Sequence, residues 1–321
     1  MPHIHVGIDI SQATFNAAFR DGDSKWNEQS FPNTKAGRKK LLAWAGADAR
    51  FTMEATGYYH VETALFLQKA SIVHVCNPML VKRYSQLRLK RGKTDRADAR
   101  LIAEFAASNE DMLRPWKPMD GHLGEARGLL TAAKQVQKQI QQTSNTIHAL
   151  KLTDAGKAAA LAMSKLLRTQ RAALREIESK IAELVGQEQE SKYKAILSVP
   201  GIGPKTAAAL IVCTNGFADF ENAHQLSAYV GLSPRVFESG SSVKGKGHIC
   251  KLGNPYLRRC LYMCAVSAMI CNPVMKAYKD SLSARGKHTT VALVAVANKL
   301  LRTAFAVAKN GTHWNPEVKA A

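Results

Sequence analysis

Four acidic residues in the first third of the chain have the types and positions that metal-assisted chemistry on a phosphate requires. Asp9 lies inside an apolar run, where a carboxylate is costly unless it is paired or bound to a metal. Glu54 ends a second apolar run, and Asp95 and Asp98 share one face at the start of an expected helix. Mg²⁺ prefers carboxylate oxygens, and at a scissile phosphate it stabilises the attacking or leaving oxygen. We therefore predict a Mg²⁺ site, with Mn²⁺ as a substitute, made by four acids: Asp9, Glu54, Asp95 and Asp98.

Each acid also has a simpler interpretation. Asp95 or Asp98 alone is typical of a helix cap, and both are favoured there by the helix dipole. Glu54 alone does not distinguish a structural from a functional role. The prediction of a metal site therefore rests on the four acids taken together.

A second kind of chemistry is indicated by a serine-rich segment in the C-terminal third. Ser239, Ser241 and Ser242 lie in a Gly/Ser/Lys stretch, and a serine hydroxyl can attack phosphorus once its proton is removed. Composition alone does not choose among the three serines. The surrounding basic residues suit a DNA backbone, and we predict that nucleic acid is bound by Arg235, Lys244, Lys246, Lys251, Arg258 and Arg259. The alternative is a linker or phosphate-binding loop without catalysis.

The segment from Leu197 to Ala207 resembles a helix-hairpin-helix. Glycines in its turn permit close backbone approach, and the N–H groups at the next helix start can bind a phosphate. We predict nucleic-acid contacts from Gly201, Gly203 and Lys205. A hairpin packed inside the protein as a structural element is the alternative.

These residues must be positioned by secondary structure, which the pattern predicts in some detail. Strands are expected over 4–10, 13–20, 26–31, 51–54 and 72–76, with helices over 34–45, 58–70, 80–89 and 95–107. Three strands followed by alternating helix and strand predict an α/β domain with a mixed sheet. With the acids in this order, the domain resembles the RNase H-like (RuvC-like) nucleases.

The remainder of the chain is expected to be helical. Apolar spacings of three and four predict two long helices around a break at 154–156, packed as a coiled coil or as an ordinary hairpin within one chain. Helices between 256 and 309 should break near Asn272-Pro273 and Arg285-Gly286. We predict three domains: an RNase H-like domain over 1–118, a helical coiled-coil region over 119–192, and a mainly α domain with the hairpin and serine loop over 193–321.

The composition of the chain favours a polyanionic partner. The chain has 45 Lys and Arg against 25 Asp and Glu, a net charge of +20, which suits a polyanion. The six cysteines form no CxxC pair, so free thiols are expected rather than a zinc site. No apolar run in the sequence reaches the roughly 18 residues of a membrane span. We expect a cytoplasmic, nucleoid-associated bacterial protein that does not enter a membrane.

Read together, these motifs resemble the DEDD-type insertion-sequence transposases, a family also described as bridge-RNA-guided serine recombinases. The resemblance covers nearly the whole chain, and each motif occurs in the family's order. It rests on Gly7-Ile8-Asp9, Glu54-Ala55-Thr56-Gly57, Asn77-Pro78, Lys93-Thr94-Asp95, Asp98-Ala99-Arg100, Pro200-Gly201-Ile202-Gly203, Gly231-Leu232-Ser233-Pro234-Arg235, Ser239-Gly240, Lys251, Gly253-Asn254 and Leu257-Arg258-Arg259.

The resemblance implies that the four acids bind the metal and that Ser239, directly before a glycine, is the nucleophile. It implies a phosphoserine link to DNA and a composite site with acids and serine from different subunits. It also implies a C-terminal transposase domain, a homo-oligomer in which dimers assemble to a tetramer, and a noncoding guide (bridge) RNA that pairs with element-end and target DNA. Two alternatives stay open: an RNase H-like structure-specific endonuclease, and a non-catalytic nucleic-acid-binding protein.

Overall fold

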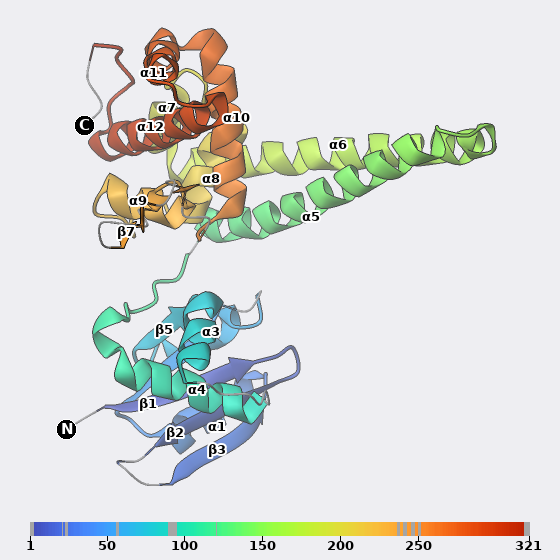
Figure 1. Ribbon diagram of the computed structural model, residues 1–321. Helices are drawn as coiled ribbons and strands as arrows, with labels where there is room; N and C mark the ends of the chain where they lie inside the picture. The colour runs from blue at the N-terminus through green and yellow to red at the C-terminus, as the bar shows by residue number, and fades with distance from the viewer. Residues whose placement is uncertain are drawn as a thin grey trace. The chain divides into compact units, whose positions relative to one another are not determined.

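The computed structural model describes residues 3–20, 22, 25–55, 58–88, 95–119, 121–235, 238–239, 243–244, 248–249 and 252–317, without the side chains of 95, 96, 235, 238, 239, 243, 244 and 248. The chain divides into two compact units (Figure 1): an N-terminal unit, Met1–Pro118, and a C-terminal unit, Met119–Ala321. Each unit has hydrophobic cores of its own.

Five strands form one mixed sheet in the N-terminal unit. They are β1 (Ile4–Ile10), β2 (Thr14–Arg20), β3 (Trp26–Pro32), β4 (Ala49–Glu54) and β5 (Val73–Cys76). Their order in the sheet is β3-β2-β1-β4-β5. The pairs β1–β2 and β2–β3 are antiparallel, whereas β1–β4 and β4–β5 are parallel. The predicted α/β fold with a mixed sheet is confirmed.

Helices cover both faces of this sheet. Side chains alternate between the faces along a strand, so Ile8 and Phe51 point to one face while Gly7 and Asp9 point to the other. The first face carries the main core of this unit and packs on α1 (Lys35–Ala45) and α2 (Val61–Leu67). On the other face, α3 (Pro78–Leu87) and α4 (Asp95–Ser108) enclose a smaller core (Figure 1). The short helix η1 (Glu110–Met112) follows.

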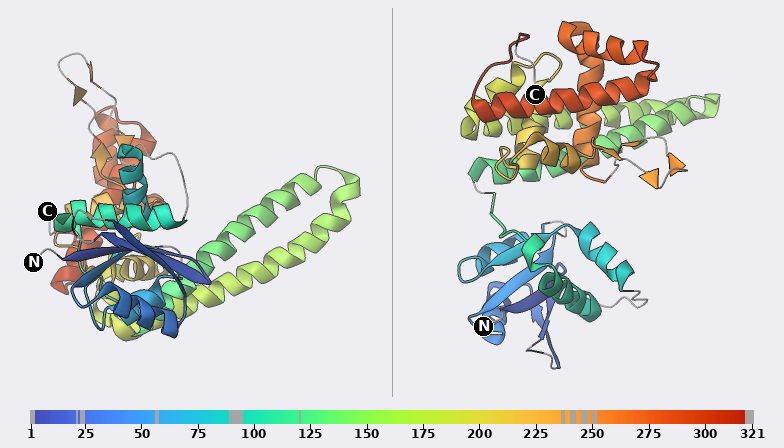
Figure 2. Two further views of the ribbon diagram at one scale, coloured as in Figure 1. Left: turned by 90° about the horizontal axis from the view of Figure 1, so that it is seen from below. Right: turned by 60° about the vertical axis from the view of Figure 1, so that its left-hand side comes forward.

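A long helical hairpin opens the C-terminal unit. Helix α5 (Gly121–Leu150) and helix α6 (Lys157–Glu188) are joined by the short helix η2 (Asp154–Gly156), and they pack along each other (Figure 2). The two long helices predicted around residues 154–156 are therefore confirmed. The foot of the hairpin, including Leu130 and Leu184, belongs to the same core as the helices that follow, so no core boundary separates the hairpin from them.

Those helices are α7 (Glu190–Leu197), α8 (Pro204–Thr214), α9 (Ala223–Val230), α10 (Pro255–Cys271), α11 (Pro273–Ala284) and α12 (Thr289–Asn310). The predicted breaks near 272 and 285 are confirmed. Asn272 explains the first: its side chain accepts from the Met275 N–H and donates to the Pro200 carbonyl, while Pro273 starts α11 at an angle of 103° to α10.

Helix α12 is long and apolar enough, by composition, to meet the length of a membrane span, but 56% of its apolar window is buried within the unit. It packs against α7, α9, α10 and α11 as a core helix. Of the described cysteines, Cys76, Cys260 and Cys264 are buried free thiols as predicted, whereas Cys271 is exposed.

Candidate functional site

Asp9 and Glu54 occupy neighbouring positions in the sheet. Strands β1 and β4 are parallel, with Ile8 paired to Met53, so the next residues, Asp9 and Glu54, lie side by side at the carboxyl ends of their strands. Both are half-buried. Because paired residues point to the same side, their carboxylates emerge on the face that α4 covers.

A glycine lets α4 lie directly on β1. A Cβ at Gly7 would overlap the Ala99 carbonyl oxygen and the Ala103 amide nitrogen, and would lie 3.0 Å from the Ala103 Cα. Farther along the chain, Glu110 meets His5, near the start of β1. Helix α4 therefore runs antiparallel to β1, and its first turn lies toward Asp9.

This direction places the remaining two acids. Asp98 directly precedes Ala99 and is half-buried on the helix that covers Asp9 and Glu54. Asp95 is the first residue of α4, and its side chain lies outside the described structure.

The donors match a hard divalent ion in chemistry, since all four are carboxylates. Within the described residues, however, no group of three or more His, Cys, Asp or Glu side chains is arranged to hold a metal ion. The structure thus gathers Asp9, Glu54 and Asp98 on one side of the sheet without closing a ligand set.

Asp9, Glu54 and Asp98 form what we call the acidic edge, at the carboxyl ends of β1 and β4. Cys76 lies beside it. It pairs with Glu54 across β4 and β5, and it is buried. Burial, and to a lesser degree the Glu54 charge, raise the pKa of the Cys76 thiol to about 11. The Cys76 thiol is therefore protonated at neutral pH, and its soft sulfur is not a donor that Mg²⁺ prefers.

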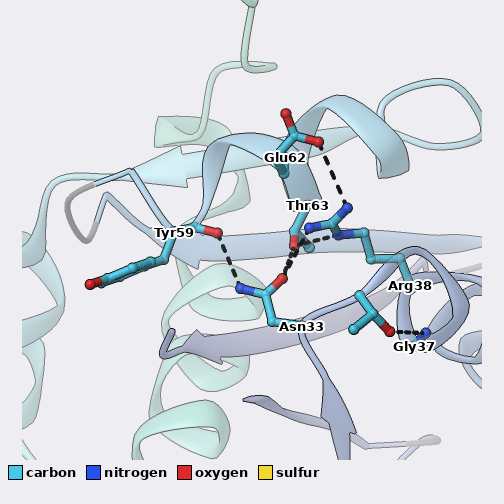
Figure 3. Close-up of polar contacts among 7 residues, drawn as sticks. Asn33, Gly37, Arg38, Tyr59, Glu62 and Thr63 are labelled. Carbon is cyan, nitrogen blue, oxygen red and sulfur yellow. Dashed lines mark hydrogen bonds and ion pairs between the residues drawn. The ribbon is translucent and has the colours of Figure 1, made fainter. Parts of the chain in front are cut away.

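A polar network that the sequence did not predict fixes the segments that follow the two acids. The Asn33 side-chain amide donates to the Ser11 carbonyl at 3.1 Å, two residues after Asp9. It also donates to the Tyr59 carbonyl at 3.5 Å, five residues after Glu54 (Figure 3). One side chain thus ties both segments together.

Asn33 is itself held by α1 and α2. Its side-chain oxygen accepts from Arg38 Nη2 at 3.1 Å and from the Thr63 hydroxyl at 3.2 Å. Arg38 also donates from Nε to Thr63 and pairs with Glu62 at 3.8 Å. The spacing of 25 to 30 residues between Thr63 and its partners explains why the sequence carried no signal for this network.

The opposite end of the same face carries a second polar cluster. Glu110 pairs with Arg50 and with His5, and His74 is buried next to them. Burial lowers the pKa of His5, against the effect of Glu110; it also lowers the pKa of His74, with Arg50 acting in the same direction. Both histidines are therefore neutral at pH 7, and the cluster anchors η1 rather than forming part of the acidic edge.

In the C-terminal unit, Ser239 lies on a short ribbon. Strand β7 (Glu238–Ser239) pairs with β8 (Val243–Lys244), with Ser239 opposite Val243. Below it, β6 (Pro234–Arg235) pairs with β9 (His248–Ile249). Four of the predicted residues, Ser241, Ser242, Lys246 and Lys251, lie outside the described residues, and Arg235 and Lys244 are described in backbone only.

The serine ribbon consists of β6, β7, β8 and β9. Its base, next to Gly253 and Asn254, is fixed between α9 and α10. Gly253 has φ +129°, and a Cβ there would overlap the Tyr229 carbonyl and lie 2.8 Å from the Gly231 nitrogen. The Asn254 N–H donates to that Tyr229 carbonyl at 2.8 Å, and its side chain accepts from the Tyr256 and Leu257 N–H groups to cap α10. Only glycine fits at 253.

The segment that we predicted to be a helix-hairpin-helix consists of α7, a turn and α8. Gly201 has φ +102°, and a Cβ on it would lie 2.7 Å from the Ala268 Cβ, so this glycine lets the turn pack against α10. Gly203 faces open space at the start of α8. Lys205 pairs with Glu178 of α6 at 2.5 Å, so part of its charge is neutralised within the protein.

The two predicted arginines of α10 differ in their surroundings. Arg258 is half-buried and donates to the Val230 carbonyl at 2.9 Å, next to the ribbon base. Arg259 is exposed and donates to the Gln137 side chain of α5 at 2.8 Å. Arg259 is therefore the more accessible cation.

Two family models match the sequence. The DEDD model of the IS110 type, described as a transposase, matches residues 6–156, and a model described as the transposase IS116/IS110/IS902 family matches residues 193–280. The first range contains the four predicted acids, and the second contains the helix-hairpin-helix, Ser239 and both arginines.

Similar proteins match over most of the chain. The sequence is 27% identical to the pilin gene-inverting protein of Moraxella lacunata and 26% identical to that of Moraxella bovis, each over 99% of both chains. It is 28% identical to the transposase for insertion sequence element IS1111A of Coxiella burnetii, over 92% of this chain and 86% of that protein.

Proposed function

The chain belongs to the DEDD-type transposases of the IS110/IS116 family, enzymes that act on DNA, and from this premise we propose that it cuts and rejoins DNA strands through a covalent bond between Ser239 and a phosphate. The observation that carries the proposal is the pairing of Asp9 and Glu54 on one sheet face beneath α4. The strand order and directions support an RNase H-like arrangement of this unit.

In the proposed step, the Ser239 oxygen attacks phosphorus and the bond from phosphorus to a deoxyribose oxygen breaks. The hydroxyl proton passes to that leaving oxygen or to solvent. A DNA hydroxyl then attacks the phosphoserine, restoring both the phosphodiester and the serine. Mg²⁺ or Mn²⁺ held by Asp9, Glu54, Asp95 and Asp98 would supply charge stabilisation at the phosphate. Asn33 keeps the strand ends that carry Asp9 and Glu54 in place.

A hydrolytic endonuclease is the second candidate, because such acids also serve simple cleavage. The full-length relatives in Moraxella are named for inverting a gene, and inversion requires that every cut end be rejoined. This favours a covalent intermediate, which conserves the bond energy for rejoining.

We further propose, from the family resemblance, that the active form is a tetramer built from dimers and that a noncoding guide RNA pairs with the DNA partners. The test is co-purification of the chain with RNA transcribed from the flanks of its coding region, followed by sequencing. Recovery of no specific RNA would contradict guidance without affecting the assignment of Ser239.

The experiment for the serine is to trap reactions of the full chain with element-end DNA and metal ion, and to resolve protein–DNA adducts under denaturing conditions. Ser239→Ala should abolish the adduct and cleavage while DNA binding persists. Ser191→Ala, at an exposed serine of the same unit, is the matched control and should form the adduct normally. Adduct formation by Ser239→Ala would transfer the role to Ser241 or Ser242, and cleavage without any adduct would favour the endonuclease.

The acids are tested separately. Asp9→Asn and Glu54→Gln should abolish metal-dependent cleavage and leave DNA affinity unchanged, because the lost groups act on the reacting phosphate. Asp48→Asn removes one exposed charge from the same unit and should cleave normally. Full activity in Asp9→Asn would exclude that carboxylate as an essential ligand.

A further inference from the structure

The long hairpin carries an uneven distribution of charge. Between residues 126 and 175 the sequence has one acid, Asp154, and nine basic residues: Arg127, Lys134, Lys138, Lys151, Lys157, Lys165, Arg168, Arg171 and Arg175. Asp154 pairs with Lys157 at 2.6 Å at the tip of the hairpin. The rest of this region has no acid of its own to offset its positive charge.

Three of these cations form a stripe on α5. Arg127 and Lys134 are two helical turns apart, and Lys138 follows one turn later, so all three lie along one side of the helix. The stripe extends for roughly 16 Å at about 1.5 Å per residue. Arg127 and Lys138 are exposed, and Lys134 is half-buried.

The cations of this α5 stripe are not neutralised within the described structure. None of the three pairs there with an acid, whereas Lys180 and Lys205 of the same unit pair with Glu183 and Glu178. Lys134 instead lies 4.7 Å from the centre of the Tyr256 ring, which fixes its position without cancelling its charge.

The stripe adjoins the base of the serine ribbon. Tyr256 is capped by Asn254, the residue that closes the ribbon base, and Gln137 of α5 accepts from Arg259 at 2.8 Å. Arg259, which is exposed, therefore adds a fourth cation beside Lys134 and Lys138. A nucleic acid lying on this surface would pass next to the foot of the segment that carries Ser239.

We propose that Arg127, Lys134 and Lys138 bind the phosphate backbone of duplex DNA and lead it to the base of the serine ribbon. The inference rests on the proposed function for its choice of DNA. A straight row of cations on a rigid helix suits the backbone of a duplex. Single strands are commonly held by stacking on open aromatic rings, but Tyr256 is only 9% exposed and is covered by Lys134.

The test is equilibrium binding of a labelled element-end duplex to the full chain between about 0.05 and 0.3 M salt, a range in which phosphate contacts dominate the salt dependence. Arg127→Gln/Lys134→Gln/Lys138→Gln should lower the slope of log affinity against log salt by about 3, because each phosphate contact contributes about 0.9. At 0.1 M salt this corresponds to a loss of affinity of roughly 100-fold or more.

The matched control is Lys276→Gln/Arg285→Gln/Lys287→Gln, which removes the same charge from exposed positions at α11 and the turn after it. It should lower affinity far less than the α5 variant. Circular dichroism and thermal unfolding establish that both triple variants are folded. The single change Lys138→Glu, compared with Lys276→Glu, repeats the test with less risk to folding.

Two results would overturn the inference. Equal affinities and slopes for the α5 variant and its control would make the stripe an ordinary solvated surface. Loss of binding to a structured RNA duplex with unchanged DNA binding would assign the stripe to RNA. Adduct formation by the wild-type chain at saturating DNA is measured in parallel; if it fails while the α5 effect remains, the proposed function falls and the DNA-binding stripe stands.

Discussion

Replacing Gly7 by alanine tests whether the close packing of α4 on β1 sets the relative positions of the acids at the acidic edge. The new Cβ would overlap two backbone atoms of α4, from Ala99 and Ala103, and backbone cannot rotate away as a side chain can. Helix α4 would have to move by roughly 1 Å to restore ordinary contact distances. Asp98 moves with it, because it directly precedes Ala99.

Two magnitudes follow from this displacement. Overpacking of a tight contact costs about 1–3 kcal/mol, so the N-terminal unit should unfold at lower denaturant concentration. A shift of about 1 Å in a catalytic group can slow a reaction by roughly 100-fold. We expect cleavage of element-end DNA to fall by about that factor, with DNA affinity unchanged because the residues that we predict to bind nucleic acid lie in the other unit.

Denaturant unfolding should be followed by tryptophan fluorescence in a Trp314→Phe background, since the remaining tryptophans, Trp26, Trp44 and Trp116, all lie in the N-terminal unit. Gly186→Ala is the control: its Cβ faces open space within α6 of the C-terminal unit, so the unfolding transition of the N-terminal unit should be unchanged. Wild-type stability and cleavage in Gly7→Ala would refute the reasoning.

Three further predictions concern other parts of the chain. Asn33→Ala should slow cleavage at least tenfold with unchanged DNA affinity, because the strand ends after both acids lose their shared donor; single-turnover cleavage measures this. Gly253→Ala should reduce adduct formation at saturating DNA, because the ribbon base cannot close. The free energy of unfolding of the N-terminal unit should decrease as the pH is lowered below about 6.5, the ordinary histidine pKa. In that range the unfolded chain binds protons that His5 and His74 do not bind in the folded unit. The slope reaches at most about 1.4 kcal/mol per pH unit for each histidine, and denaturant unfolding at pH 5.5 and 7.5 measures it.

Each of these has a control. For Asn33→Ala the control is Asn145→Ala, at an exposed position of α5, which should cleave normally. For Gly253→Ala the control is Gly286→Ala, where an added Cβ contacts no other atom, and this variant should form the adduct normally. His74→Gln should remove part of the pH dependence, while exposed His122→Gln should keep all of it. A pH dependence unchanged by His74→Gln would contradict the assignment.

The sequence predicted the elements well because their signals are local. Apolar runs marked the strands of the sheet, and Asn272-Pro273 marked the break that the structure confirms between α10 and α11. In the structure, Asp9 and Glu54 share one face because β1 and β4 are parallel neighbours. Their roles, and that of Ser239, stay predictions.

What the sequence did not reveal depends on contacts between distant residues. The heptad spacing that predicted α5 and α6 continues into the foot of the hairpin, so it gave no sign that Leu130 and Leu184 join the core of the later helices. The sequence also did not reveal that Gly201, which we predict to contact DNA, lies so close to Ala268 of α10 that an added Cβ would overlap it. The pair of Lys205 with Glu178 likewise joins residues 27 positions apart, beyond any local pattern.

The thiol of Cys76 makes the acidic edge observable without a substrate. Thiolates, not thiols, react with alkylating reagents, and a pKa of about 11 in a buried position keeps this sulfur unreactive while the sheet edge is closed. The rate of alkylation at Cys76, distinguished by peptide mapping from alkylation at the exposed Cys271, therefore measures how often β5 opens away from Glu54. An ion that bridges the carboxylates would make these openings rarer and would slow the alkylation. The labelling rate would then report ion binding in protein without DNA.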